Sequence, residues 1–183
     1  MEVEIAYKET DPGLIPAEWP LKPLGELCVK IQDGTHFSPK LGGGDYLYVT
    51  SKHIGRGSLD VSDADTVSSE EHSKIYPRCD VRKGDVLLTK DGANTGNAAL
   101  NHLDEQFSML SSVALLRFDI DRHSPGYYLQ CILSRQGQRQ IKGMMSGNAI
   151  TRLTLEKIRE LRFPSPPLPE QRAIAEALSD VDA

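Results

Sequence analysis

The sequence predicts an α+β fold: a mixed β-sheet core, a peripheral helical third and a C-terminal helix. Apolar runs rich in β-branched residues, typical of buried strands, fall in the first two thirds of the chain. Helical patterns with capping residues fall in the last third, and such segregation of strands from helices is characteristic of α+β proteins. We expect an N-terminal extension at residues 1–15, a domain at 16–167 and the helix at 168–183.

Three segments have the composition of strands, at residues 46–50, Val86–Thr89 and Val113–Phe118. Each is rich in β-branched, aromatic or leucine side chains and is bounded by polar or glycine-containing turns. The segment 24–31 is apolar enough to be an element, but its pattern suits a helix as well as a strand.

Serine and threonine residues mark the starts of four predicted helices, because their side chains can accept a hydrogen bond from a free amide of the first turn. These residues are Ser68, Ser124, Ser134 and Thr154. The spacing between Ser68 and Glu71 is that of a capping box and predicts a helix over Ser69–Ile75. Ser124 precedes Pro125, a favoured first helical residue, and predicts a helix reaching about Leu133.

A proline-rich stretch leads into the last helix. Pro169 suits the first helical position, and Glu170 places negative charge at the positive end of the helix dipole. Ile174, Leu178 and Val181 recur at i, i+4 and i+7 and form one apolar stripe. A helix this short is marginal alone in water. We therefore expect it to lie outside the domain core and to contact another helix through Glu170 and the stripe.

Composition limits the class of protein. The chain has 183 residues and a formal net charge of −5. Its acidic, polar start is not a secretory signal, and no apolar run is long enough to cross a membrane. Three widely spaced cysteines, Cys28, Cys79 and Cys131, argue against a disulfide framework or a zinc site and favour a reducing cytoplasm.

The charge is unevenly distributed. Residues 135–162 contain seven lysines and arginines but only two glutamates. Although an acidic protein is a poor general partner for nucleic acid, a local basic region can attract phosphates. Ordinary charges on helix surfaces would give the same pattern, so this interpretation needs further support.

The sequence lacks the motifs of several enzyme classes. It has no phosphate-binding loop ending in Gly-Lys-Ser/Thr, no Gly-x-Ser-x-Gly elbow and no His-x-x-x-His metal pair. The Asn-Pro-Pro-Tyr tetrad and glycine-rich cofactor loop of an adenine methyltransferase are also missing. Asp85, Lys90 and Asp91 are the only candidate nuclease set, without the usual spacing. We expect no catalysis, no metal and no cofactor in this chain.

Two polar loops follow predicted strands, at residues 50–54 and 89–97. Their Asn and Lys side chains are of the kinds that contact base edges and phosphates. Their small residues would let the backbone approach a ligand closely. Plain turns containing Asn and Asp have the same composition, so the residues alone leave both interpretations open.

The C-terminal tract Pro-Pro-Leu-Pro-Glu-Gln-Arg-Ala-Ile-Ala, followed by Leu-Ser-Asp-Val-Asp, resembles a junction in one known family. It is similar to the join between the target recognition domain and the conserved connector helix in specificity (S) subunits of type I restriction–modification systems. Residues 33–36, 48–54, 83–92 and 146–153 resemble further recurrent segments of that family, in the same order. The resemblance covers residues 16–183.

The resemblance implies a non-catalytic domain that binds double-stranded DNA and recognises one half of a bipartite target. It would direct a partner modification (methyltransferase) subunit and a partner restriction (translocase/nuclease) subunit, to which S-adenosylmethionine, ATP and Mg²⁺ would belong. The family typically has two recognition domains joined by long helices that form a coiled coil. This chain has one domain and the start of one helix, so it is either a fragment or a half-subunit that forms a homodimer.

The predicted DNA contacts are the polar residues of the loops that carry the resemblance. They are Thr35, His36, Ser51, Lys52, His53, Arg56, Lys90, Asn94, Thr95, Asn148 and Arg152. Two other interpretations stay open: a protein-interaction module that acts through its C-terminal helix, and a stand-alone nuclease. Salt-dependent DNA binding would distinguish a DNA recognition domain from a protein-interaction module, and metal-dependent cleavage would identify a nuclease.

Overall fold

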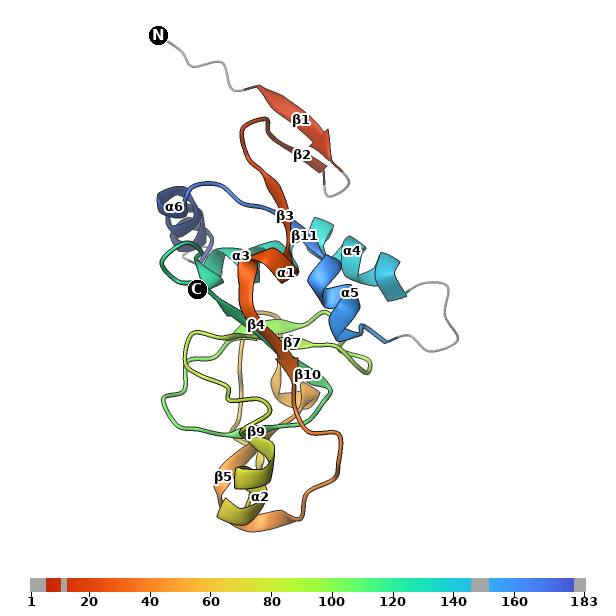
Figure 1. The fold of residues 1–183 in the computed structure, drawn as a ribbon, viewed down its shortest axis with the longest axis vertical. Coiled ribbons are helices and arrows are strands. Elements are labelled where there is room, and N and C mark those ends of the chain that lie inside the picture. Colours follow the sequence, from red (N-terminus) through yellow and green to blue (C-terminus); the bar gives the residue numbers. More distant parts are fainter. Residues whose placement is uncertain (1–5, 11–12, 146–151, 180–183) are drawn as a thin grey trace.

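A four-stranded antiparallel sheet lies at the centre of the protein in the computed structural model, which describes residues 6–10, 13–145 and 152–179. Figure 1 shows its strands between a group of helices and a loop-rich lobe. The strands follow the order β4 (Cys28–Asp33), β10 (Val113–Phe118), β7 (Val86–Thr89) and β8 (Ala98–Leu100). The predicted strands that became β7 and β10 are confirmed with the expected bounds.

Alternate side chains of β10 enter two different hydrophobic cores. Ala114, Leu116 and Phe118 pack against the helices, whereas Val113 and Leu115 face the loop-rich lobe. Because both faces are covered, its first four residues, Val113 to Leu116, are an apolar run instead of an alternating one, and Arg117, the exception, is paired with Asp85. Each fully buried Val or Leu contributes about 1.5–3 kcal/mol relative to an exposed one.

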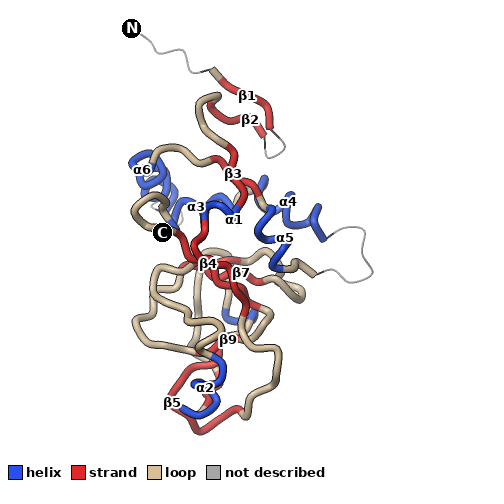
Figure 2. Tube along the Cα trace, in the orientation of Figure 1, coloured by secondary structure: helices blue, strands red, loops and turns tan. Residues whose placement is uncertain are grey.

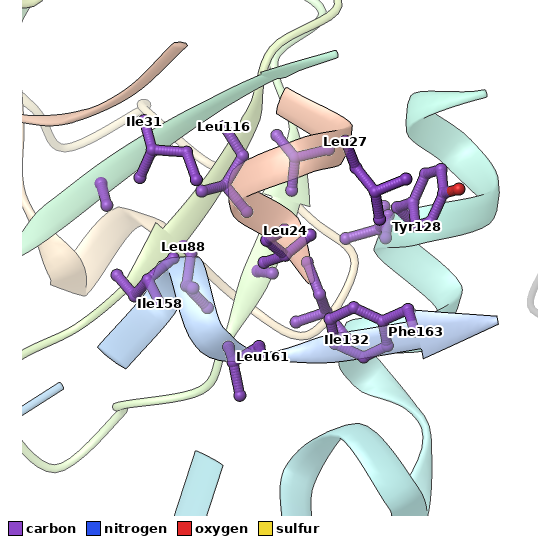
Figure 3. Packing of buried hydrophobic residues seen from close by; sticks show 14 of the residues in the cluster. Leu24, Leu27, Ile31, Leu88, Leu116, Tyr128, Ile132, Ile158, Leu161 and Phe163 are labelled. Atoms are coloured by element: carbon purple, nitrogen blue, oxygen red, sulfur yellow. The ribbon is translucent and has the colours of Figure 1, made fainter. Parts of the chain in front are cut away.

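Five helices pack on one face of this sheet (Figure 1). They are α1 (Leu24–Leu27), α3 (Pro125–Leu133), α4 (Arg135–Met145), α5 (Leu155–Glu160) and α6 (Leu168–Ser179). Figure 3 shows Leu24 and Leu27 of α1 beside Tyr128 of α3 in their shared core. The Tyr128 ring stacks on Phe118 with the ring centroids 4.7 Å apart, which aligns α3 with β10.

The predicted helix starts are confirmed by their hydrogen bonds. The side chains of Ser68, Ser124, Ser134 and Thr154 each accept from the amide three residues later. The open interpretation of residues 24–31 is decided by the fold, which contains both elements: helix α1 ends at Leu27 and strand β4 begins at Cys28.

The loop-rich lobe on the other face contains a three-stranded sheet. Strand β5 (Leu41–Val49) lies between β6 (Asp65–Val67), which is antiparallel to it, and β9 (Ser108–Met109), which is parallel. The 3₁₀ turn η1 (Ser51–His53) follows β5, and helix α2 (Ser69–Ile75) belongs to the same lobe, as Figure 2 shows. With sheets of both kinds and segregated helices, the predicted α+β class is confirmed.

Two short antiparallel pairs involve the beginning of the chain. Strand β3 (Leu21–Pro23) pairs with β11 (Arg162–Pro164), which ties the start of the domain to its end. Before it, β1 (Tyr7–Thr10) and β2 (Gly13–Pro16) form a hairpin at the edge of the molecule (Figure 1).

Helix α6 packs on the domain, which corrects the expectation that it lies outside the core. Ile174 and Ala175 contact the hydrophobic core beneath the helices. Leu178, one turn later, is 43% exposed, and Val181 lies outside the described residues. The apolar stripe predicted from periodicity is therefore divided: its first part packs on its own domain, and Leu178 faces solvent.

The buried side chain of Gln171 fixes α6 in place. Its Oε1 accepts from the amide of Ser124 at 2.9 Å, and its Nε2 donates to the carbonyl of Pro166 at 2.7 Å. The hydroxyl of Tyr128 donates to Ser165 Oγ at 2.9 Å and holds the proline-rich stretch on α3. A glutamine that satisfies both ends of its amide inside a core specifies one orientation of the helix.

The backbone at Gly34 lies so close to β9 that an amino acid with a side chain does not fit at this position. A Cβ atom added there would lie 2.0 Å from the carbonyl oxygen of Met109. We expect Gly34→Ala to lower the free energy of unfolding by about 1–3 kcal/mol, because the loop must move away from β9. Gly143→Ala in α4, where an added Cβ meets no atom within 4 Å, is the control and should be neutral or slightly stabilising. Equal urea midpoints for the two variants would contradict this account.

Burial of His72 makes stability depend on pH. Its ring stacks on Tyr46 with centroids 3.8 Å apart, and its Nδ1 lies 3.0 Å from Ser108 Oγ. Burial lowers the pKa of His72 below its ordinary value of 6.5. The unfolded chain then takes up the proton at a higher pH than the folded one does. The His72 contribution to the free energy of unfolding should therefore be constant above about pH 6.5 and should decrease below it. Urea denaturation at about pH 5.5 and about pH 7.5 measures this loss of stability. The decrease in the free energy of unfolding between the two pH values should be smaller in His72→Gln than in the wild type, and an equal decrease would show that His72 is not its origin.

Candidate nucleic-acid interface

Asp33, the last residue of β4, is a buried carboxylate surrounded by two permanent cations, Arg78 and Lys90, and by the imidazole of His36. Its Oδ1 accepts from Arg78 at 2.9 Å, and its Oδ2 lies 3.1 Å from His36 Nε2 and 3.5 Å from Lys90 Nζ. These residues come from the ends of β4 and β7 and from the segment after α2. A buried carboxylate is stable only when its charge is compensated, so Asp33 holds these cations together.

Asp91 continues this arrangement on the other side of Lys90. It accepts from Lys90 Nζ at 2.9 Å and from Arg152 Nε at 3.0 Å. Burial disfavours its charged form, but the hydrogen bonds from Arg152 and Lys90 outweigh that effect and hold the pKa of Asp91 below its usual value. The Lys90 ammonium therefore bridges two aspartates, and the whole set forms one ion network, called the Asp33 network below.

The Asp33 network has its carboxylates inside and its cations outside. The side chains of His36, Arg78 and Arg152 are 55%, 48% and 53% exposed, whereas that of Asp33 is 4% exposed. Lys90, Arg78 and Arg152 carry three permanent positive charges against the two carboxylates. The surface of this acidic protein is therefore locally cationic, which suits a phosphate backbone.

One turn between β9 and β10 joins the loops around the network. The Ser111 amide donates to the Thr35 carbonyl at 2.9 Å, and the Lys90 amide donates to the Ser112 carbonyl at 2.9 Å. The Ser112 hydroxyl accepts from the Ser51 amide at 3.3 Å. Three of the predicted loops thus meet at a turn that the sequence pattern did not single out.

Comparison with known proteins assigns this fold to a family. Residues 16–183 match the family described as Type I restriction modification DNA specificity domain. The chain belongs to this family. The Type I restriction enzyme MjaVIII specificity subunit of Methanocaldococcus jannaschii is 22% identical over 184 residues, which is 97% of this chain and 42% of that protein. The predicted resemblance is confirmed.

Two solved structures share the fold of this DNA specificity domain. A chain from a study of complex assembly and conformational transition of the type I R-M system has a TM-score of 0.66 and 20% identity. It is matched over 92% of this chain and 39% of its own length. The HsdS subunit from Thermoanaerobacter tengcongensis has a TM-score of 0.62 and 21% identity, over 92% and 38%. The present chain thus spans about two fifths of the length of these relatives.

Three predicted DNA contacts of this specificity domain are buried. Thr35 accepts from the Phe37 amide at 3.2 Å, His53 Nδ1 accepts from the Thr50 amide at 2.8 Å, and Lys90 joins the network. Burial and then the charge of nearby Lys52 lower the pKa of His53 and favour its neutral form. In this structure these residues position loops and do not face solvent. Their type and place in the sequence resemble those of exposed loop residues, so only the tertiary contacts distinguish them.

Two predicted DNA contacts after β5, Lys52 and Arg56, are exposed but each contacts another residue of the chain. The Lys52 ammonium lies 3.5 Å from Asp63 Oδ2, in a pair that solvent screens. Arg56 donates to the carbonyl of Leu133 at the end of α3, at 2.9 Å, and has no ion pair with the Asp33 network among the described residues. These contacts bring neither Lys52 nor Arg56 to the network.

The hairpin between β7 and β8 presents Asn94 at its exposed tip. Thr95 closes the turn, its hydroxyl donating to the carbonyl of Gly92 at 2.7 Å. Gly92 and Gly96 have φ values of 95° and 97°, which glycine adopts without strain. Gln138 of α4 donates to the Gly96 carbonyl at 2.8 Å and fixes the hairpin. Asn148, the remaining predicted contact in this region, lies outside the described residues.

The structure separates the residues of the alternative nuclease set. Asp85 precedes β7 and is paired with Arg117 at 2.8 Å, whereas Asp91 follows β7. Because a strand rises about 3.3 Å per residue, the two carboxylates belong to opposite ends of β7 and cannot share a metal. Among the described residues, no group of three or more His, Cys, Asp or Glu could hold a metal ion. No described helix is long and apolar enough to cross a membrane.

The sequence pattern did not reveal the roles of Asp33 and Arg78. Asp33 lies in the segment 33–36 that carried the resemblance, so that segment was the available signal. Arg78 has no local signal, because its role depends on a carboxylate that is distant in the sequence.

Lys90→Met should test the difference between a buried and an exposed member of the network. We expect it to lower the free energy of unfolding by about 3–5 kcal/mol, because two carboxylates lose their shared cation. Arg152→Ala should lower it far less, because a half-exposed ion pair contributes little. Chemical denaturation of both variants measures this, and similar losses would show that Lys90 is not the anchor.

Proposed function

We propose that this chain recognises one half of a bipartite DNA target as the specificity subunit, or half-subunit, of a type I restriction–modification complex. The observation that carries the proposal is the Asp33 network, with its outer cations and inner carboxylates, in a member of the DNA specificity domain family. A cationic surface on a protein of net charge −5 is unusual enough to mark a polyanion-binding face.

The exposed cations of the network would hold DNA phosphates. Arg78 and Arg152 are already oriented by the carboxylates of Asp33 and Asp91, so less side-chain freedom is lost when a phosphate binds. Arginine also offers two parallel N–H donors to a phosphate. Such contacts set the position of the domain on DNA but carry no sequence information.

Base recognition would then come from the polar side chains beside this face. Asn94 stands at the exposed tip of the β7–β8 hairpin, and asparagine can form two hydrogen bonds with adenine in the major groove. The hydrogen bond from Gln138 holds this hairpin in place. A side chain that recognises a base needs such a fixed support.

Catalysis would belong to partners and not to this chain. We propose that the modification subunit supplies S-adenosylmethionine chemistry and that the restriction subunit uses ATP and Mg²⁺. The separation of Asp85 from Asp91 along β7 supports this division, because the candidate nuclease residues of the chain do not meet.

A specific observation also favours a protein-interaction role for α6. Exposed Leu178 borders an apolar cleft of about 210 Å³, which Leu14, Tyr127 and Ile174 also line. With Glu170 on its first turn, this surface could accept a second helix, either from another copy of the chain or from the modification subunit. The two roles are compatible, because the cleft and the network are built from different residues.

Binding to duplexes of mixed sequence tests the phosphate contacts. Arg78→Ala and Arg152→Ala should each weaken binding to all sequences and reduce the salt slope by about one unit per lost contact. Arg82→Ala is the matched control, because Arg82 is also exposed and paired with an aspartate but lies before β7, away from the network. If the three variants bind alike, the network is not the DNA-binding face.

Sequencing of methylated sites, in cells that express the chain with its modification partner, tests base recognition. Asn94→Ala should relax the preference at particular positions by about 1–3 kcal/mol of discrimination. The network variants should reduce methylation evenly instead. Unchanged sites and levels in all variants would count against the proposed function as a whole.

A further inference from the structure

A hollow of about 390 Å³ adjoins the Asp33 network. It is lined by Thr35, His36 and Phe37, which follow β4, and by Lys74, Ile75 and Arg78, at the end of α2 and just after it. Its volume is in the range of small-molecule sites. Of these lining residues, only Thr35 and His36 are among the DNA contacts predicted from the sequence.

Phe37 is the aromatic wall of this hollow. Its side chain is 46% exposed, although a phenylalanine normally packs inside a protein. Its backbone is nevertheless fixed, because the Phe37 amide donates to the hydroxyl of buried Thr35 at 3.2 Å. The Thr35 amide in turn donates a hydrogen bond to the Met109 carbonyl at 2.7 Å. An exposed ring on an anchored loop contributes little to folding and is held ready for a contact outside the chain.

Arg78, another lining residue, supplies positive charge in a fixed direction. The Arg78 guanidinium is held by Asp33 at 2.9 Å, and its side chain is half exposed. Lys74 is paired with two carboxylates, Glu70 and Glu71, so it adds no positive charge to the hollow. The hollow therefore combines one flat apolar ring, one oriented guanidinium and the imidazole of His36 on the same carboxylate.

We propose that this hollow binds a single unstacked nucleobase of DNA, with the base against the Phe37 ring and its phosphate on Arg78. The inference rests on the proposed DNA recognition and adds a site to it. A base has a flat apolar face and a phosphate one sugar away, which matches a ring and a cation that line the same hollow. Arg78 also connects the hollow to the remaining phosphate-binding cations, so one strand of DNA could follow both.

The test uses two short duplexes of the same mixed sequence, one fully paired and one with a single unpaired base. An unpaired base has less stacking to lose, so it should enter the hollow more readily. We expect the full chain to bind the bulged duplex about tenfold more tightly than the paired one, within the range of one base–aromatic stack. Fluorescence anisotropy at fixed salt measures both affinities.

Variants of Phe37 assign this preference. Phe37→Ala should abolish the tenfold preference and leave the affinity for the paired duplex within about twofold, whereas Phe37→Tyr should retain the preference. Ile120→Ala is the control, because Ile120 is also exposed but does not line the hollow, and it should behave as the wild type.

The outcomes separate this inference from the proposed function. If the wild type binds the paired duplex in a salt-dependent way but shows no preference, or if Phe37→Ala keeps the preference, the base-binding hollow is refuted and DNA recognition stands. The hollow is also refuted if Arg78→Ala weakens both duplexes equally while Phe37→Ala changes neither affinity, because it would then hold only phosphate. If the wild type binds neither duplex, both proposals are wrong.

Discussion

Burial of both faces of β10 is the constraint on which the rest of the structure depends. Side chains from one strand fill two cores, so the helical layer and the loop-rich lobe must both be present for the sheet to be covered. The strands β4 and β7 lie on either side of β10 and end at the same edge of the sheet. Asp33 is the last residue of β4, Lys90 follows β7, and the two side chains form an ion pair there. The position of the candidate DNA-binding face is thus a consequence of how the sheet is packed.

Buried carboxylates beneath exposed cations give this face its character. Desolvation makes Asp33 and Asp91 costly unless each is compensated, and Lys90 compensates both. The outer arginines are then held in defined directions, whereas surface arginines usually sample many conformations. Such a rigid arrangement of positive charge would suit the proposed binding to DNA.

Helix α6 transmits the orientation of the domain to whatever lies beyond it. Gln171 satisfies the amide that opens α3 and a carbonyl of the proline-rich stretch, so the helix cannot pivot without leaving both unpaired. A connector fixed in this way would hold a second recognition element at a defined angle.

The sequence by itself determined the elements whose causes are local. Caps at Ser124 and Thr154 and the apolar runs of β7 and β10 predicted bounds that the fold confirms, because capping and hydrophobic patterning act over a few residues. The motifs also identified the family. Only the tertiary structure decided which polar residues face solvent. Lys90 and Arg152 look alike in the sequence, but one is enclosed by Asp33 and Asp91 and the other is exposed. Burial of a charge depends on partners distant in the chain, and no local pattern records them.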